Sequence, residues 1–300
     1  MSSPYLKHIL PFVLIIRPQQ WVKNLFVFLP MFFGGMMTDG DCWQSAAWTF
    51  ISFSLMASAV YCFNDVRDAE ADRIHPSKRK RQVAAGNLSP MQALALMVIL
   101  VLMSLAIATQ LLPRRWMMVG AVMAGYFVLN IAYSVGLKRI AIVDVMIIAI
   151  GFVMRVVAGG LACGIPLSPW IVVMTFLLTL FLAFAKRRDD VVIRLDTGVI
   201  TRRSTLSYTL PFLNQVLGLL AAVTLVGYIL YTLSPEVVMR VGSPYVYITS
   251  IWVLAGMLRY MQTVIADNHG GNPERDLLRD PFLMTCVAGW LTTFAILLYA

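Results

Sequence analysis

Three aspartates follow one another at a spacing that suits metal chemistry. Asp65, Asp68 and Asp72 stand at positions i, i+3 and i+7, so a helix would place their carboxylates along one stripe. Asn64 adds an amide oxygen beside them. Mg²⁺ prefers such hard oxygen ligands and binds through one or two carboxylates together with substrate phosphates. The spacing therefore predicts a Mg²⁺ site at Asn64, Asp65, Asp68 and Asp72.

A straight helix through these residues has two geometric consequences. Arg67 and Glu70 would point to its other side. Asp65 and Asp72 would lie about 10 Å apart along the helix axis, too far to hold one ion together, so either two ions bind or one aspartate acts indirectly. The alternative is a solvated acidic helix end that the following basic loop neutralises.

Basic segments accompany the acidic stripe. HPSKRKR follows it directly, RPQQWVKN lies near the start of the chain, YSVGLKR covers residues 133–139, and KRRDD covers residues 186–190. Lys and Arg around Mg²⁺ are suited to binding a diphosphate and stabilising it as it leaves. We therefore predict a phosphate-binding surface, in which KRRDD clamps a second phosphate. The alternative for KRRDD is a positively charged membrane anchor.

The elements that must position these residues are membrane helices. The chain has 300 residues, of which 59% are hydrophobic and 13% charged. Apolar runs of about 20 residues recur, each long enough to cross a bilayer. They fall at 21–38, 43–63, 90–110, 116–133, 141–163, 169–186, 211–233, 244–264 and 281–299. We expect an all-α polytopic membrane protein with about nine transmembrane helices around a cytoplasm-facing cavity.

Charge gives these helices an orientation. The loops at 64–90, 134–140, 186–210 and 259–280 carry most of the Lys and Arg residues, and alternating helices bring all four to one side. Positive loops stay cytoplasmic, so we expect the N-terminus and the active site on the cytoplasmic side of the inner membrane. Topology alone is the alternative explanation for many of these cations. The tail segment at 259–281 is either a lid or a connector.

Two ionisable residues lie within the fifth predicted helix. Asp144 and Arg155 are 11 residues apart, which returns them to within about 20° of the same helix face. Ionisable groups inside a membrane are costly and usually line a cavity. We predict that Asp144 acts in catalysis and that Arg155 binds substrate. The alternative is structural pairing with neighbouring helices.

Together these segments resemble a known family. NDVRDAEAD matches the NDxxDxxxD signature of the UbiA superfamily of intramembrane polyprenyl transferases. RPQQWVKN, YSVGLKRIAIVDV, GFVMRVVAGG, AKRRDD and the tail segments GGNPE and LLRDP resemble the decaprenyl-phosphate phosphoribosyltransferase branch, over nearly the whole chain. The resemblance implies a single UbiA-type transmembrane domain over residues 1–300. Departures from the branch pattern are Gln82 for Pro, Asp190 for Glu, and Asn214 where an acid is expected.

The resemblance also implies an activity. It is the Mg²⁺-dependent transfer of 5-phosphoribose from 5-phosphoribosyl 1-diphosphate (PRPP) to a decaprenyl-type polyprenyl phosphate, which in some members serves cell-wall synthesis. Prenyl-transferring relatives carry a second DxxxD motif where this chain reads KRRDDVVIRLD. The extra cations agree with a reaction that involves three phosphate groups.

Roles follow for individual residues. Catalysis is predicted for Asp65, Asp68, Lys138 and Asp144. Substrate binding is predicted for Gln19, Lys23, Asn24, Arg67, Lys78, Arg81, Tyr133, Arg155, Lys186, Arg187, Arg188 and Asp190. The expected partners are PRPP, polyprenyl phosphate and the lipid bilayer, without nucleic acid, and a homo-oligomer is left open.

Two other functions are left open. A prenyltransferase that moves an isoprenoid from its diphosphate to an aromatic acceptor would need the same acidic motif, although KRRDD argues against it. A transporter for an anionic metabolite would need a binding site at the membrane midplane, whereas the charge lies on one side.

Overall fold

The regular elements of the described residues are all helical. The computed structural model describes residues 4–74, 78–111, 115–200, 202–266 and 279–299. Its α-helices are α1 (Pro4–Ile16), α2 (Leu29–Phe33), α3 (Gly40–Arg67), α4 (Ala69–Arg73), α5 (Pro90–Leu111), α6 (Trp116–Val135), α7 (Val143–Cys163), α8 (Pro169–Thr197), α9 (Leu210–Leu233), α10 (Pro235–Val241), α11 (Ser250–Ile265) and α13 (Pro281–Tyr299). Its 3₁₀ helices are η1 (Pro18–Phe28), η2 (Lys78–Lys80), η3 (Leu137–Arg139), η4 (Arg203–Ser207) and η5 (Pro244–Thr249).

Within these described ranges, eight helical stretches are long and apolar enough to cross a membrane. They are Gly40–Arg67, Pro90–Gln110, Trp116–Val135, Val143–Cys163, Pro169–Thr197, Leu210–Leu233, Pro244–Ile265 and Pro281–Tyr299. Each coincides with one of the apolar runs that the sequence predicted. The prediction of an all-α, multi-pass membrane protein is therefore confirmed.

The first predicted helix, over residues 21–38, is not a single helix. The 3₁₀ helix η1 and the short helix α2 occupy this region instead, and α1 precedes them. Pro18 and Pro30 stand in the first turns of η1 and α2. Proline fits a first turn but lacks the N–H that would continue a preceding helix. Gly35, with φ of 72°, follows α2 and supplies a left-handed turn.

The chain divides into two compact units. Residues 1–137 and 151–167 form the first unit, and residues 138–150 and 168–300 form the second. The boundary between 150 and 151 falls inside α7, so this helix contributes residues to each unit. The single domain over 1–300 that the sequence predicted stays a prediction.

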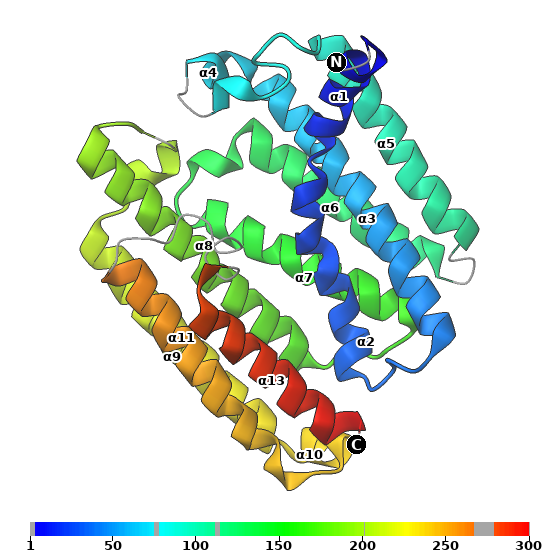
Figure 1. The fold of residues 1–300 in the computed structure, drawn as a ribbon, viewed down its shortest axis with the longest axis vertical. Helices are drawn as coiled ribbons and strands as arrows, with labels where there is room; N and C mark the ends of the chain where they lie inside the picture. The colour runs from blue at the N-terminus through cyan, green and yellow to red at the C-terminus, as the bar shows by residue number, and fades with distance from the viewer. Residues whose placement is uncertain (1–3, 75–77, 112–114, 201, 267–278, 300) are drawn as a thin grey trace. The chain divides into compact units, whose positions relative to one another are not determined.

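Helix α3 is the centre of the first unit. It contacts α1, η1, α5 and α6, and Figure 1 shows α3 and α5 running side by side. Small side chains on α3, including Ser54, Ala57 and Ser58, are fully or almost fully buried and permit this close packing. Ser52 of α3 and Ser104 of α5 each donate a hydroxyl hydrogen bond to the other's backbone carbonyl, at 2.6 and 2.7 Å. Such reciprocal bonds tie helices together where water is absent.

The second unit is a row of packed helices. Helix α8 contacts α9, and α11 contacts both α9 and α13. In Figure 1 these last three helices, coloured yellow to red, lie side by side. Its core includes the buried rings of Phe181, Phe184, Tyr208 and Tyr260. The aromatic core packs around the C-terminal half of α8, where the KRRDD segment lies.

Gly159 provides a direct test of the packing between α7 and η1. A Cβ atom at Gly159 would lie 1.9 Å from the backbone oxygen of Val27. Gly159→Ala should therefore lower the free energy of unfolding by about 1–3 kcal/mol through overpacking, read as a lower Tm of the detergent-purified protein. Gly120→Ala is the matched control, because a Cβ there meets nothing within 4 Å. An unchanged Tm for Gly159→Ala would contradict the close approach.

Candidate functional site

The acidic motif spans a break between two helices. Helix α3 ends at Arg67, Asp68 stands between the helices with φ −98° and ψ 1°, and α4 begins at Ala69. Asp65 and Asp72 are only 2% and 4% exposed, and Asp68 is partly buried. Arg67 and Glu70 are exposed. This difference in exposure agrees with the prediction that Arg67 and Glu70 lie on the other side of the helix from the aspartates.

Arg81 joins the first and last aspartates of the motif. One of its guanidinium nitrogens lies 2.7 Å from Asp72 Oδ2 and 3.9 Å from Asp65 Oδ1. Both carboxylates therefore face one cationic group. The expectation that Asp65 and Asp72 do not hold one metal ion together stays a prediction, because contacts with a guanidinium nitrogen do not test metal ligation.

Arg17 is the second cation at the motif. Its guanidinium forms a hydrogen-bonded ion pair with Asp65 and lies 5.1 Å from the ring centroid of Tyr61, one turn earlier on α3. The prediction of site residues omitted Arg17, although the RPQQWVKN segment begins with it. The sequence feature that could have pointed to Arg17 is its place in this basic segment, directly before Pro18.

Asn64 is held by a neighbouring helix. Its Oδ1 accepts the hydroxyl of Ser134, which lies in α6 and also contacts the backbone oxygen of Asn130 at 2.7 Å. A carbonyl oxygen has two lone pairs, so this bond fixes the side chain and leaves it a second acceptor site.

The donor set fits a hard divalent cation in chemical type. Asp65 and Asp72 offer carboxylate oxygens that already converge on the positive charge of Arg81. Across the described ranges, no three His, Cys, Asp or Glu side chains gather as a metal-binding group. Mg²⁺ rarely uses an all-protein cage and takes several ligands from water and substrate phosphates. Asn64, Asp65, Asp68 and Asp72 therefore fit Mg²⁺ that is bound jointly with a phosphate.

The 3₁₀ helix η1 packs against α3 through one row of residues. Three residues per turn align Trp21, Asn24 and Val27. The indole N–H of Trp21 donates to Ser58 Oγ at 3.1 Å, and the Asn24 amide donates to Ser54 Oγ at 2.8 Å. Asn24, predicted to bind substrate, is thus buried in packing contacts. The other predicted residues of this unit lie nearer the surface: Gln19 and Arg67 are exposed, and Lys23, Lys78 and Tyr133 are partly buried.

Arg155 is buried within an aromatic cage. Its guanidinium donates to Asn24 Oδ1 at 2.7 Å, to the Gly151 oxygen at 2.7 Å and to the Tyr126 hydroxyl at 3.1 Å. Its guanidinium carbon also lies 4.9–5.1 Å from the ring centroids of Phe53, Tyr126 and Phe152. Ring faces stabilise a desolvated cation. These contacts favour the structural alternative that the sequence left open for Arg155.

A second charged cluster lies in the second unit. Asp144 and Arg187 are both fully buried, and Arg187 Nε donates to Asp144 Oδ2 at 2.6 Å. Ser204 Oγ donates to the same carboxylate oxygen at 2.9 Å. Arg187 also donates to Asp190 Oδ2 at 3.1 Å, and Arg202 lies 3.5 Å from that oxygen. Acids and bases thus alternate along the cluster, and Arg187 joins α7 to α8.

Tyr208 closes this cluster with a neutral hydroxyl. Burial, helped by the nearby Asp144 carboxylate, raises the pKa of Tyr208 to about 12. The phenol therefore stays protonated at neutral pH and donates to Asp144 Oδ1 at 3.4 Å, while its oxygen accepts the Ile142 backbone N–H at 2.5 Å. Ile142 has a left-handed φ of 70°, so the backbone is turned here to reach Tyr208.

Arg188 holds the end of α11. It donates to Asn214 Oδ1 at 2.8 Å and to the backbone oxygens of Val264 and Ile265 at 2.5 and 3.2 Å. Cations are favoured at the carbonyls that end a helix. Asn214, where the resemblance leads one to expect an acid, therefore still serves as the acceptor for Arg188. Lys138 and Lys186 are partly exposed and lie closer to solvent than Arg187 and Arg188.

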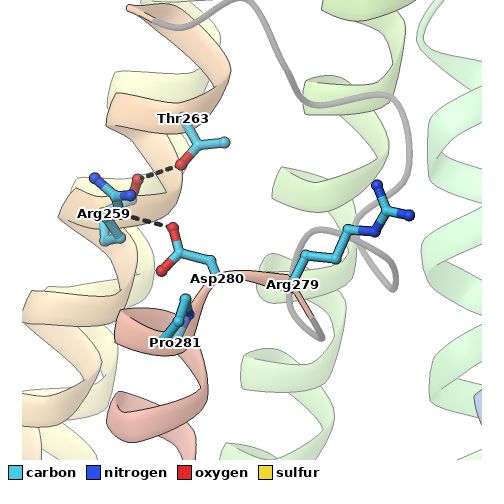
Figure 2. Close-up of a pocket in the computed structure, with 5 residues that line it drawn as sticks. All are labelled: Arg259, Thr263, Arg279, Asp280 and Pro281. Atoms are coloured by element: carbon cyan, nitrogen blue, oxygen red, sulfur yellow. Dashed lines mark hydrogen bonds and ion pairs between the residues drawn. The ribbon is translucent and has the colours of Figure 1, made fainter.

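A shallow pocket of about 230 Å³ lies between α11 and the start of α13. Figure 2 shows Arg259 and Asp280 facing each other across it, with their side-chain atoms 2.7 Å apart, and Arg279 pointing elsewhere. Burial would raise the pKa of Asp280, but the N–H groups of Leu283 and Phe282 together with Arg259 hold it below its usual value. Asp280 thus caps α13. Most of the predicted lid or connector at 259–281 lies outside the described residues.

Comparisons with known proteins agree on one family. A sequence model of the UbiA prenyltransferase family matches residues 27–275. The chain is 35% identical over 282 residues to a decaprenyl-phosphate phosphoribosyltransferase of Mycobacterium tuberculosis, covering 93% of this chain and 91% of that protein. It is 34% identical over 294 residues to the protein of the same name from Mycolicibacterium smegmatis, covering 95% and 91%.

The fold is similar to that of a solved structure. A UbiA homolog from Archaeoglobus fulgidus, bound to GPP and Mg²⁺, superposes with a TM-score of 0.70 over 99% of this chain and all of that chain. The two sequences are 19% identical, so this likeness concerns the fold. Together with the family match, it confirms the resemblance inferred from the sequence motifs.

The buried pair in the second unit generates a stability prediction. Asp144→Asn would leave the Arg187 charge buried without its carboxylate, and breaking a buried pair in this way typically costs about 3–5 kcal/mol. We expect a clear fall in Tm of the detergent-purified protein. Asp196→Asn, at an exposed position of the same unit, should leave Tm unchanged. A normal Tm with abolished turnover would instead favour the catalytic role predicted for Asp144.

Proposed function

Because the chain belongs to the UbiA prenyltransferase family, we propose that it transfers 5-phosphoribose from PRPP to a decaprenyl-type polyprenyl phosphate and releases diphosphate. The observation that carries this proposal is the likeness, over more than nine-tenths of the chain, to proteins named for that transfer. The chain is accordingly a transferase of the glycosyl-transferring class. The acidic and basic clusters supply a chemical account of it.

The acidic motif is assigned to the diphosphate of PRPP. Asn64, Asp65, Asp68 and Asp72 would hold Mg²⁺, which when bound supplies charge to the departing diphosphate. Arg81 and Arg17 already lie at these carboxylates and are placed to donate to diphosphate oxygens. Lys23, on η1, adds a further positive charge. These groups stabilise the negative charge that develops as the leaving group departs.

The transfer step itself needs little from the protein beyond position and charge. The bond from the ribose anomeric carbon to the diphosphate oxygen breaks, and an oxygen of the polyprenyl phosphate forms the new bond to that carbon. A phosphate monoester is ionised at neutral pH, so no strong general base is required. Holding the two reactants in line supplies much of the rate enhancement.

The basic cluster of the second unit is assigned to the other phosphates. Lys138 and Lys186 are the partly exposed cations of this unit and would contact the ribose 5-phosphate or the acceptor phosphate. Arg187 and Arg188 are buried and hydrogen-bonded, so we assign them mainly to positioning α8. Asp190 and Tyr133 are retained as substrate-binding candidates.

The charge distribution and the apolar helices indicate the orientation in the membrane and the routes of the two substrates. The one-sided distribution of Lys and Arg supports an orientation with the N-terminus and the acidic motif in the cytoplasm, at the inner membrane. PRPP would reach the site from water, and the apolar helices would accommodate the isoprenoid tail.

The proposal is tested by following the transferred sugar. Purified protein is incubated in detergent with labelled PRPP, polyprenyl phosphate and Mg²⁺, and label is then counted in the organic phase. We expect lipid-bound label that disappears when EDTA removes the metal. No transfer from PRPP, with consumption of a prenyl diphosphate when an aromatic acid is supplied, would assign the protein to prenyl transfer instead.

Substitutions at the acidic motif test its role in the same assay. Asp65→Ala and Asp68→Ala should each lower turnover at least about 100-fold, because the leaving diphosphate loses its counter-charge. Glu70→Ala is the matched control, since Glu70 is an exposed acid in the same segment and should keep near-normal activity. Size-exclusion profiles should show that all three variants still fold. Normal turnover in both aspartate variants would remove the metal site from the mechanism.

A further inference from the structure

Arg17 adopts a backbone conformation that few residues other than glycine adopt. Its φ of 55° and ψ of 62° are left-handed, and among the described residues only Ile142 shares a positive φ without being glycine. A residue before proline normally prefers an extended backbone. Left-handed conformations of this kind are costly and persist where the surrounding structure enforces them, often at functional sites. At Arg17 this conformation accompanies a side chain that reaches Asp65.

The segment that follows Arg17 is firmly attached. Trp21 bonds to Ser58, and Asn24 bonds to Ser54 and accepts from Arg155. These bonds hold the backbone that follows Arg17 in place. Its guanidinium, in contrast, is 21% exposed and is the part of the residue that meets the acidic motif.

Arginines offset most of the negative charge of the motif. Asp65, Asp68 and Asp72 carry three negative charges, and Arg17 and Arg81 carry two positive charges within ion-pair distance of Asp65 and Asp72. A divalent cation arriving alone at Asp65 would compete with Arg17 and leave an excess of positive charge. A diphosphate arriving with the metal would supply oxygens that accept from the displaced guanidinium.

We propose that Arg17 couples metal binding to diphosphate binding. This inference rests on the proposed function and deepens it. Arg17 holds Asp65 and exchanges that carboxylate for a diphosphate oxygen when Mg²⁺ binds. The metal alone therefore binds weakly, and the diphosphate raises the affinity for metal by the same factor by which the metal raises the affinity for diphosphate. Arg17 thereby disfavours a metal-loaded site that lacks the leaving group.

The test uses Mn²⁺ in place of Mg²⁺, with the detergent-purified full chain. The first measurement is the affinity for Mn²⁺ alone, from the electron paramagnetic resonance signal of unbound Mn²⁺. The second is the affinity for labelled inorganic diphosphate at saturating Mn²⁺, by equilibrium dialysis. Arg17→Gln should bind Mn²⁺ alone about tenfold more tightly, because Asp65 loses its competing cation. The same variant should bind manganese diphosphate about tenfold more weakly, because it loses a charge-assisted donor.

Three further variants define the origin of these changes. Arg17→Lys keeps the positive charge and should retain the weak binding of Mn²⁺ alone. Arg17→Gln combined with Asp65→Asn should lose the gain in Mn²⁺ affinity, which would locate the gain at Asp65. Arg73→Gln, at an exposed position in α4, should leave both affinities unchanged. Melting temperatures of all variants exclude differences in folding.

Opposite changes in the two affinities identify the coupling. Weakening of both would show that Arg17 only maintains the structure of the site, and an unchanged Mn²⁺ affinity would show that it does not compete with metal. Either result overturns the inference. The probes contain no sugar, so these outcomes are distinct from failure of the phosphoribosyl transfer assay, which concerns the proposed function.

Discussion

A carboxylate buried at the end of an apolar helix needs a cation, and both compact units are organised around this requirement. In the first unit Asp65 and Asp72 lie against Arg17 and Arg81, and in the second Asp144 lies against Arg187. Taking one such charge out of water without a partner costs several kcal/mol. Each ion pair therefore fixes the relative placement of segments far apart in the sequence, such as residues 17 and 65 or 144 and 187.

The two sets of ion pairs differ in exposure, and this difference separates their roles. Arg187 and Asp144 have no exposed side-chain surface, so any rearrangement would leave charges unpaired in a low dielectric. Arg17 and Arg81 are 21% and 27% exposed, so water and soluble anions can reach them. The interior pair is suited to holding helices, and the accessible pairs are suited to exchanging partners with a ligand. A phosphate site needs cations of the second kind.

Much of this arrangement can be read from the sequence, because composition and periodicity act locally. Apolar runs of bilayer length located eight helices, and the spacing of Asp65, Asp68 and Asp72 separated them from the exposed Arg67 and Glu70. The errors arise where tertiary structure decides. The apolar run at 21–38 contains Pro30 and closely follows Pro18, and a helical wheel cannot show the break at Asp68.

The sequence also does not indicate which groups a buried charged residue will contact. Nothing near Arg155 in the sequence indicates that Phe53 and Tyr126 will surround it, and nothing near Arg188 indicates that it will cap α11. A charged residue in an apolar segment shows that some partner must exist. The fold decides whether that partner is a ligand, a ring or a carbonyl.

The 3₁₀ form of η1 shows how the packing requirement shapes the local structure. Three residues per turn keep Trp21, Asn24 and Val27 on one row, where the first two side chains bond to α3 and the Val27 backbone lies against Gly159 of α7. In an α-helix each step of three residues falls about 60° short of a full turn, so Trp21 and Val27 would diverge by about 120°. The polar bonds to Ser58 and Ser54 and the close approach at Gly159 would then not form together. The 3₁₀ geometry thus allows the contacts of Trp21, Asn24 and Val27 to form together. These contacts hold η1 in place, and Arg17 directly precedes η1.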